Sequence, residues 1–311
     1  MSSEKTVLKD YGPMLVMAGI ILVVQITALL LAAPMNANDM QAFEDPDSTA
    51  NSIYYIGLIL VFTGFLLLAI KKNMEWIIQL VILLAVGATM YYVFYALLSL
   101  VDISVMTNNI VSGLVAAILT ILLYKFPEWY VIDTVGLIIG AGASAIFGIS
   151  LSILPVIVLL ALLAIYDAIS VYKTKHMIDL AEGVMDLHLP ILFVIPKHLK
   201  YSFIEDSLNK EEGKEKEAFF MGLGDAIMPT ILVVSANVFL VQKALEQSTT
   251  IASIGFISYP AIGAMIGTII GFMALSILVM KGKPQAGLPF LNSGVILGYL
   301  AGVLLSGAPL Y

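Results

Sequence analysis

The sequence predicts an all-α integral membrane protein with nine transmembrane helices. Hydrophobic residues make up 60% of the 311 residues and charged residues only 12%, against roughly 45–50% and 25% in soluble domains. A water-soluble fold of this size could not bury so much apolar surface, so most of the chain must face lipid. The formal net charge of −7 makes the chain poorly suited to binding nucleic acid, which is itself an anion.

Nine apolar stretches have the length that crosses a bilayer, about 20 residues each. They run over Tyr11–Ala33, Ser52–Ile70, Glu75–Leu97, Val105–Tyr124, Tyr130–Ile149, Leu151–Tyr172, Ala218–Val241, Ile251–Met280 and Gly287–Leu305. The chain therefore divides into residues 1–172 with six helices, a loop at 173–217, and residues 218–311 with three helices.

Lysine positions predict the orientation of the chain in the membrane. Only lysines need to be counted, because the chain has no arginine. When the connections are assigned alternately to two sides, the side that holds the N-terminus receives every lysine except Lys243. Cytoplasmic loops carry an excess of basic residues. The N-terminus is therefore expected in the cytoplasm and the C-terminus outside.

The loop at 173–217 has three parts of different composition. An amphipathic stretch runs from Met177 to Leu187, the apolar Leu189–Pro196 is too short to span, and Glu205–Glu217 is charged. Two interpretations stay open. The first two parts are a helix and a strand on the membrane surface, or they form a gate between the sixth and seventh spans.

Four acidic residues lie within or near the predicted spans, where a charged side chain costs roughly 2.5–3.5 kcal/mol on insertion scales. Asp102 and Asp133 are close enough to helix ends to be interfacial. Asp167 and Asp225 are expected about 9 Å and about 12 Å from the cytoplasmic ends of the sixth and seventh spans. Because these two spans are antiparallel, both carboxylates are predicted at a similar depth.

The residues around Asp225 favour a working site. Gly222 and Gly224 have no side chains, so a neighbouring helix or a substrate backbone can approach closely. Pro229 has no N–H to donate to the carbonyl of Asp225, and its ring opens that turn of the helix. In a membrane such a break is tolerated where it lines a water-filled cavity or meets a neighbour.

Two close carboxylates cannot both ionise, so they share one proton. One can then take a proton from a water while the other protonates a peptide carbonyl, which is aspartic-protease chemistry. This reaction needs no metal or other cofactor. We expect neither, because cysteine is absent and His176, His188 and His198 lack the spacing of metal ligands.

The motifs resemble a known family. Tyr166-Asp167 in a sixth span, Gly222-Leu223-Gly224-Asp225 in a seventh and nine spans in all are similar to the GxGD intramembrane aspartyl proteases of the presenilin and signal-peptide-peptidase group. The resemblance implies that Asp167 and Asp225 are catalytic, with Tyr166, Gly222, Leu223, Gly224 and Pro229 supporting them. It also implies that the substrate is the transmembrane helix of another membrane protein.

The third signature of this family is a Pro-Ala-Leu motif at the start of the ninth span. The corresponding stretch here is Ala286-Gly287-Leu288-Pro289. Leu288 and Pro289 match the family's Pro-Ala-Leu-Pro, whereas Ala286 and Gly287 depart from its first two positions. Pro289 is expected to prevent a regular helix start.

The two branches of the family differ in orientation. The lysine positions favour the presenilin sense, whereas the run Gly-Asp-Ala-Ile-Met-Pro at 224–229 is closer to the peptidase branch. We expect a microbial homologue in the plasma membrane. Whether it forms homo-oligomers stays open.

Two other functions are compatible with intramembrane acids. A proton- or cation-coupled transporter or channel also uses broken helices and carboxylates, but these lie at the midplane and accompany inverted repeats, which are not visible here. A prepilin-type peptidase also uses a GxGD aspartate, but it resembles a smaller bundle. In a protease, Ile191–Ile195 could bind an unwound substrate as an added β-strand.

One further motif predicts packing. Gly263, Gly267 and Gly271 recur every four residues in the eighth span. A stripe of small residues at this spacing is typical of closely packed transmembrane helices.

Overall fold

The computed structural model describes residues 2–72, 74–174, 192–198, 201–204, 218–246, 252–280 and 285–310. Within these ranges, nine helices are long and apolar enough to cross a membrane. The predicted number of spans is therefore confirmed. The predicted stretch from Met177 to Leu187, the tail Glu205–Glu217, and the residues His176 and His188 lie outside the described ranges.

The long helices follow the predicted spans to within a few residues at most ends. Their bounds are α1 Ser2–Ala37, α2 Ala50–Lys71, α3 Glu75–Leu98, α4 Val105–Lys125, α5 Trp129–Ser150, α6 Ile153–Ile169, α9 Leu223–Glu246, α10 Tyr259–Val279 and α11 Gly287–Ser306. The π-helical turn η1, Ser170–Thr174, continues α6. Thus the chain is largely helical, as the composition predicts.

Two short antiparallel sheets accompany the helices, and one of their strands lies within Leu189–Pro196, where one of the two interpretations of the loop expected a strand. β1, Leu192–Pro196, pairs with β2, Ala218–Gly222, and β3, Ser253–Ile254, pairs with β4, Ile257–Ser258. The predicted starts of the seventh and eighth spans were wrong. β2 and the β3–β4 hairpin lie where the first residues of these two helices were expected. A short apolar run suits a buried strand and a helix equally well, so its composition does not decide between them.

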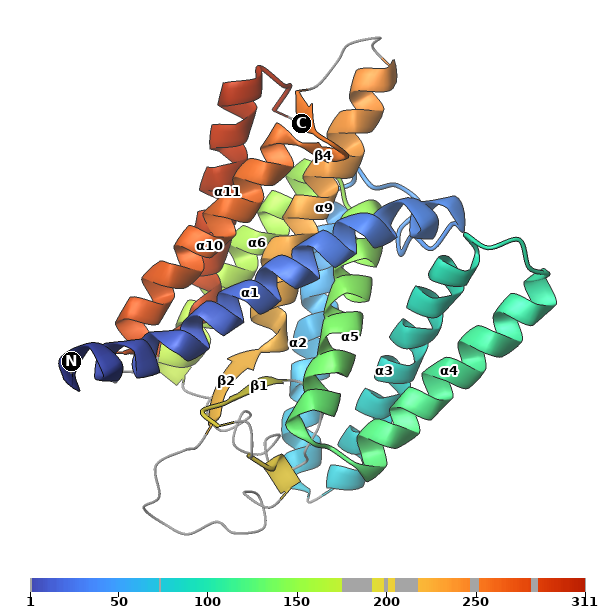
Figure 1. The fold of residues 1–311 in the computed structure, drawn as a ribbon. Coiled ribbons are helices and arrows are strands. Elements are labelled where there is room, and N and C mark those ends of the chain that lie inside the picture. Colours follow the sequence, from blue (N-terminus) through green and yellow to red (C-terminus); the bar gives the residue numbers. More distant parts are fainter. Residues whose placement is uncertain are drawn as a thin grey trace.

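Helix α9 is the central element of the fold (Figure 1). It packs against α1, α5, α6, α10 and α11. The α10–α11 pair lies on one side of it, and α3 and α4 lie on the other side, beyond α5. β1 packs against α5 and α1, and β2 leads directly into α9. The start of α9 is therefore enclosed by helices from both halves of the chain.

The predicted glycine stripe packs against glycines of α11. A Cβ atom built on Gly263 or Gly267 would collide with the backbone carbonyl of Gly298 or Gly294, and one on Gly271 would lie 2.5 Å from the carbonyl oxygen of Phe290. The backbones of α10 and α11 are thus in direct contact, which confirms the predicted close packing. This contact fixes the position of α11, whose first residues belong to the site described below.

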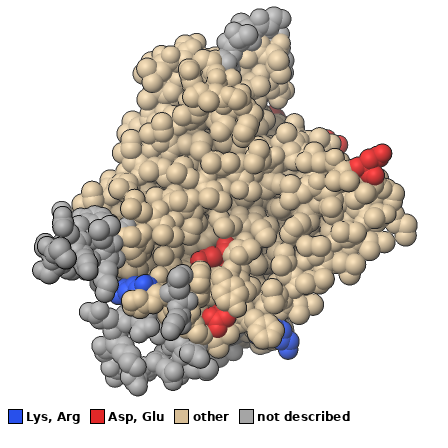
Figure 2. Space-filling model, viewed as in Figure 1, with Lys and Arg blue, Asp and Glu red and all other residues tan. Residues whose placement is uncertain are grey.

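The surface has the character of a membrane protein. Uncharged side chains cover most of the face in Figure 2. The lysines visible among its described residues lie at the lower end, where β1 and β2 lie in Figure 1. This distribution agrees with the lysine bias seen in the sequence.

Candidate active site

Asp167 and Asp225 come together where α6 ends and α9 begins. Asp167 lies two residues before the last residue of α6, and only 8% of it is exposed. Asp225 lies in the first turn of α9 and is half-buried. The two carboxyl groups are close enough to interact electrostatically. The structure thus places the two predicted aspartates in one site.

The position of Asp225 within its span differs from the sequence-based estimate. That estimate assumed a helical rise of about 1.5 Å per residue from Glu217 onward. Residues Ala218–Gly222 are instead extended in β2, and a strand rises about 3.3 Å per residue. Asp225 is therefore only three residues into its helix, at a junction between a strand and a helix.

The two carboxyl groups lie against two consecutive residues at the start of α11, Asp167 at Leu288 and Asp225 at Gly287. The backbone N–H of Leu288 donates a hydrogen bond to Oδ2 of Asp167 over 3.1 Å. A Cβ atom built on Gly287 would lie only 2.8 Å from Oδ1 of Asp225. The segment Ala286–Pro289, predicted to be part of the site, therefore touches both aspartates.

The contact between Leu288 and Asp167 follows from the way α11 begins. The first N–H groups of any helix have no partner within the helix. Helix α11 starts at Gly287 with Ala286 as its N-cap, and the Ala286 side chain makes no capping hydrogen bond. The carboxyl group of Asp167 supplies an acceptor for Leu288 instead. It therefore caps α11 from a different helix.

The start of α11 is regular, and this corrects one expectation. Pro289 lies within the first turn, where a proline is tolerated because its missing N–H would have had no helical partner. It therefore does not prevent a regular start. One turn further on, the Asn292 side chain donates to the carbonyl of Leu160 in α6 over 2.9 Å. This bond holds α11 against the helix that carries Asp167.

The Gly-Leu-Gly-Asp motif forms the strand–helix junction. Gly222 ends β2, and its backbone is hydrogen-bonded to the Asp225 side chain. This resembles a capping box, in which the third helical residue binds back to the N-cap N–H. Leu223 is packed, because its side chain would lie 3.5 Å from a Cβ atom on Gly140. The motif thus ties the orientation of Asp225 to the end of the strand.

Gly224 faces open space. A Cβ atom built there would meet no described atom within 4 Å, and the residue is exposed. The sequence suggested that either a neighbouring helix or a substrate backbone could approach this glycine. Among the described residues, no neighbouring helix comes close to it. No described residue fills the space beside Gly224.

The two other predicted supporting residues lie on the same helices as the aspartates. Pro229 is buried within α9, one turn after Asp225. Tyr166 is half-buried on α6, directly before Asp167. Their place on these helices does not test the predicted support, which stays a prediction.

Asp133 anchors the sheet beside the site. Its Oδ1 accepts a hydrogen bond from the N–H of Val194 in β1 over 2.7 Å. The sequence predicted only an interfacial residue, because nothing in it indicates which backbone group the carboxylate meets. The bond also uses an N–H on β1 that a strand added along Ile191–Ile195 would need. The structure therefore does not support strand addition at Val194.

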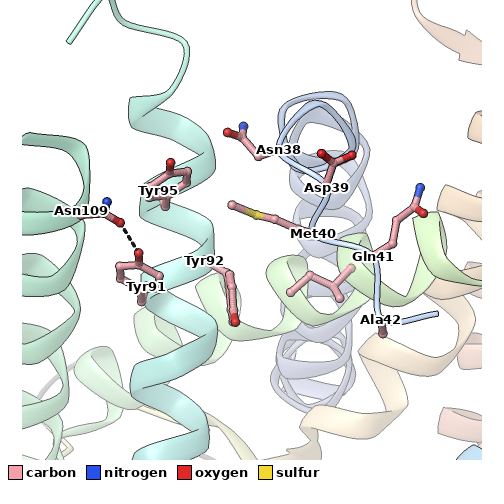
Figure 3. A pocket seen from close by; sticks show the side chains of 10 residues that line it. Asn38, Asp39, Met40, Gln41, Ala42, Tyr91, Tyr92, Tyr95 and Asn109 are labelled. Carbon is pink, nitrogen blue, oxygen red and sulfur yellow. Dashed lines mark hydrogen bonds between the residues drawn. The ribbon is translucent and has the colours of Figure 1, made fainter. Parts of the chain in front are cut away.

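A cavity lies in another part of the molecule. It has a volume of about 480 Å³ and is lined by the connection after α1 together with residues of α3, α4 and α5 (Figure 3). Tyr91 donates to Asn109 at its edge over 2.5 Å. None of the predicted site residues lines this cavity. It lies at the ends of α1 and α3, whereas the aspartates lie at the end of α6.

Comparison with known proteins identifies the family. The model of the family described as "Signal-peptide peptidase, presenilin aspartyl protease" matches residues 18–308. The chain belongs to this family. It is therefore a multi-pass integral membrane protein and an aspartic endopeptidase of the intramembrane-cleaving type.

Two solved structures of presenilin-family intramembrane aspartate proteases agree with this assignment. One, in space group C222, is 41% identical with a TM-score of 0.68, covering 94% of this chain and 99% of its own. The other, in space group P2, is 40% identical with a TM-score of 0.66, covering 95% and 99%. The comparison with curated proteins gives no match. This membership favours the protease over the transporter and the prepilin-type peptidase.

Proposed function

We propose that this protein hydrolyses peptide bonds within the transmembrane helix of single-span membrane proteins, with Asp167 and Asp225 as an aspartyl pair that shares one proton. The observation that supports this most directly is the convergence of both carboxyl groups on Gly287 and Leu288. Family members act on membrane-protein substrates within the bilayer, and a pair of neighbouring acids at the end of two helices suits that reaction.

The chemistry follows from the shared proton. The ionised carboxyl group takes a proton from a water molecule, whose oxygen attacks the peptide carbon, while the protonated carboxyl group donates its proton to the carbonyl oxygen. The product is a neutral gem-diol. Its collapse breaks the C–N bond. The protonated carboxyl group gives its proton to the leaving nitrogen, while the ionised carboxyl group takes a proton from one gem-diol hydroxyl, so the products are an amine and a carboxylic acid and the pair again holds one proton. Atoms and charges balance without a metal or a covalent intermediate.

We further propose that the aspartates lie near the cytoplasmic face of a microbial plasma membrane. Lys71 and Lys125 are the last residues of α2 and α4, and Lys173 lies in η1, which continues α6. Asp167 lies at that same end of α6. Under the positive-inside rule this end faces the cytoplasm. Cleavage is thus expected in the cytoplasmic third of the substrate helix.

Substrate access is proposed on the side of Gly224. An incoming backbone can approach the start of α9 there, because no described side chain occupies the space. A helical substrate must unwind locally, since its carbonyls are otherwise bonded within the helix. The scissile carbonyl can then reach the aspartates.

The test uses the purified full-length protein in proteoliposomes with a single-span peptide. Asp167→Asn and Asp225→Asn keep the size of each side chain and remove its acid–base function, so each should reduce cleavage to background. Asp102→Asn is the matched control, because Asp102 is exposed at the end of another helix pair. Cleavage retained by either dyad variant, with both proteins folded, would contradict the proposal.

A further inference from the structure

The helix that carries Asp167 does not end as a regular α-helix. After Ile169 the chain forms the π-helical turn η1, Ser170–Thr174. In an α-helix each residue turns by about 100°, so Tyr172 would lie about 140° around the axis from Asp167. A π-turn is wider and rotates less per residue, and such turns are frequent at functional sites. This turn therefore brings Tyr172 toward the face that carries Asp167.

The hydroxyl group of Tyr172 makes two hydrogen bonds to the segment before α11. It lies 2.8 Å from Oε1 of Gln285, to which it donates, and it accepts from the backbone N–H of Ala286 over 3.3 Å. A tyrosine hydroxyl has one proton to donate and can also accept. Ala286 is completely buried, so its N–H requires a partner within the protein. Tyr172 supplies that partner.

This contact lies directly beside the residues that touch the aspartates. Ala286 precedes Gly287, which lies against Asp225, and Leu288, which donates to Asp167. The start of α11 is therefore bonded to the end of α6 at two points, Tyr172 and Asp167. These two bonds, to Ala286 and Leu288, define both the height and the rotation of this segment relative to α6. With the Tyr172 bond lost, the residues before Gly287 would be held less firmly, although Asn292 still bonds α11 to α6 further along.

We propose that Tyr172 is a positioning residue, whose hydroxyl group holds Gln285 and Ala286 so that Gly287 and Leu288 meet the two aspartates. The inference rests on the proposed function, in which these aspartates perform the hydrolysis. Tyr172 itself does not contact the reacting groups. It acts through the segment it binds.

The first experiment measures kcat and KM for the single-span peptide with three variants: Tyr172→Phe, Gln285→Ala and the double variant. Only the hydroxyl group is lost in Tyr172→Phe, and the ring is 54% exposed, so no cavity forms. We expect kcat to fall about 3- to 10-fold, the effect of losing a hydrogen bond or two, with KM unchanged. Because Gln285 acts through the hydroxyl, the double variant should lose no more than Tyr172→Phe alone.

Tyr130→Phe is the matched control. Tyr130 is 55% exposed at the start of α5, almost the same exposure as Tyr172, and it lies away from α11. Its phenylalanine variant should keep the wild-type kcat. An equal loss of kcat in Tyr172→Phe and Tyr130→Phe would overturn the inference. So would a double variant whose loss of kcat is the product of the two single losses, or a change in KM without a change in kcat.

A second measurement does not depend on activity. Hydrogen exchange of a peptide covering residues 285–290, followed by mass spectrometry, reports whether the segment is held. The exchange should be faster in Tyr172→Phe than in the wild type and unchanged in Tyr130→Phe. If residues 285–290 exchange at the wild-type rate in Tyr172→Phe, the inference is overturned even if the protein is an active protease. Conversely, if Asp225→Asn still cleaves, the proposed function fails while the exchange result still tests the contact.

Discussion

A methyl group added at Gly287 would lie 2.8 Å from Oδ1 of Asp225. The Pro-Ala-Leu motif of the family has an alanine at this position, so the chain departs from the motif at the residue that lies against an aspartate. Glycine lets the start of α11 approach the carboxyl group more closely than alanine would. The segment therefore keeps its place in the site although it departs from the motif, and the glycine that replaces alanine is in close contact with Asp225.

Replacement of Gly287 by alanine should reduce turnover without reducing stability. The nearest atom to the added methyl group is the end of the Asp225 side chain, which can rotate away at little cost. A displaced carboxyl group is no longer aligned, and a misplacement of about 1 Å can cost about 100-fold in rate. We expect kcat to fall by about 10- to 100-fold, with an unchanged thermal unfolding temperature. Gly113→Ala on α4, where a Cβ atom meets nothing within 4 Å, is the control. A wild-type kcat for Gly287→Ala would contradict this.

Asp133 should contribute to stability through β1. Val194 is 1% exposed, so Asp133→Ala leaves its N–H without the carboxylate acceptor, at a cost of about 1–3 kcal/mol. Asp133→Asn keeps an oxygen acceptor and should lose less. Thermal unfolding and hydrogen exchange of residues 192–196 measure both effects. If the alanine and asparagine variants are equally stable, the bond to Val194 is not the cause.

The α10–α11 contact should be sensitive to a single methyl group. A Cβ atom on Gly267 would collide with the backbone of Gly294 and Gly298, and backbone cannot move aside as a flexible side chain can. We expect Gly267→Ala to destabilise the protein by about 1–3 kcal/mol and to lower cleavage, because α11 carries Gly287 and Leu288. Gly57→Ala on α2 meets nothing within 4 Å and should be neutral. Comparable unfolding temperatures for both variants would refute the prediction.

The rate of cleavage should depend on pH as a bell-shaped curve. At low pH both carboxyl groups of the pair are protonated and no base remains to activate water. At high pH both are ionised and no acid remains for the carbonyl oxygen. The two limbs belong to the pair as a whole. The measurement is kcat/KM in proteoliposomes over a broad pH range, with Asp102→Asn as a control that should keep the curve. A rate that is constant across that range would count against a shared proton.

The nine spans were predictable because the thickness of a bilayer imposes a minimum length of apolar chain. Helices such as α4 and α5 accordingly begin and end close to the predicted residues. The aspartates were predictable for a related reason. A carboxyl group within lipid is costly, so Asp167 and Asp225 stand out from acids that lie in loops.

The strand before α9 was not predictable in the same way. Ala-Phe-Phe-Met-Gly at 218–222 suits a helix or a strand by composition, and its state depends on pairing with Leu192–Pro196, which lies far away in the chain. The bonds of Asp133 to Val194 and of Tyr172 to Ala286 are likewise tertiary contacts. No spacing in the sequence reports them, because each joins residues more than fifty positions apart.

The open space at Gly224 has a consequence for selectivity. On the proposed path past Gly224, this residue has no side chain of its own that could distinguish one amino acid of a substrate from another. Under the proposed function, discrimination at this point would depend on how readily a stretch of substrate gives up its helical hydrogen bonds. Susceptible proteins would be set apart by weak points in their membrane anchors, such as glycine-rich or proline-containing turns, more than by a consensus sequence at the cut.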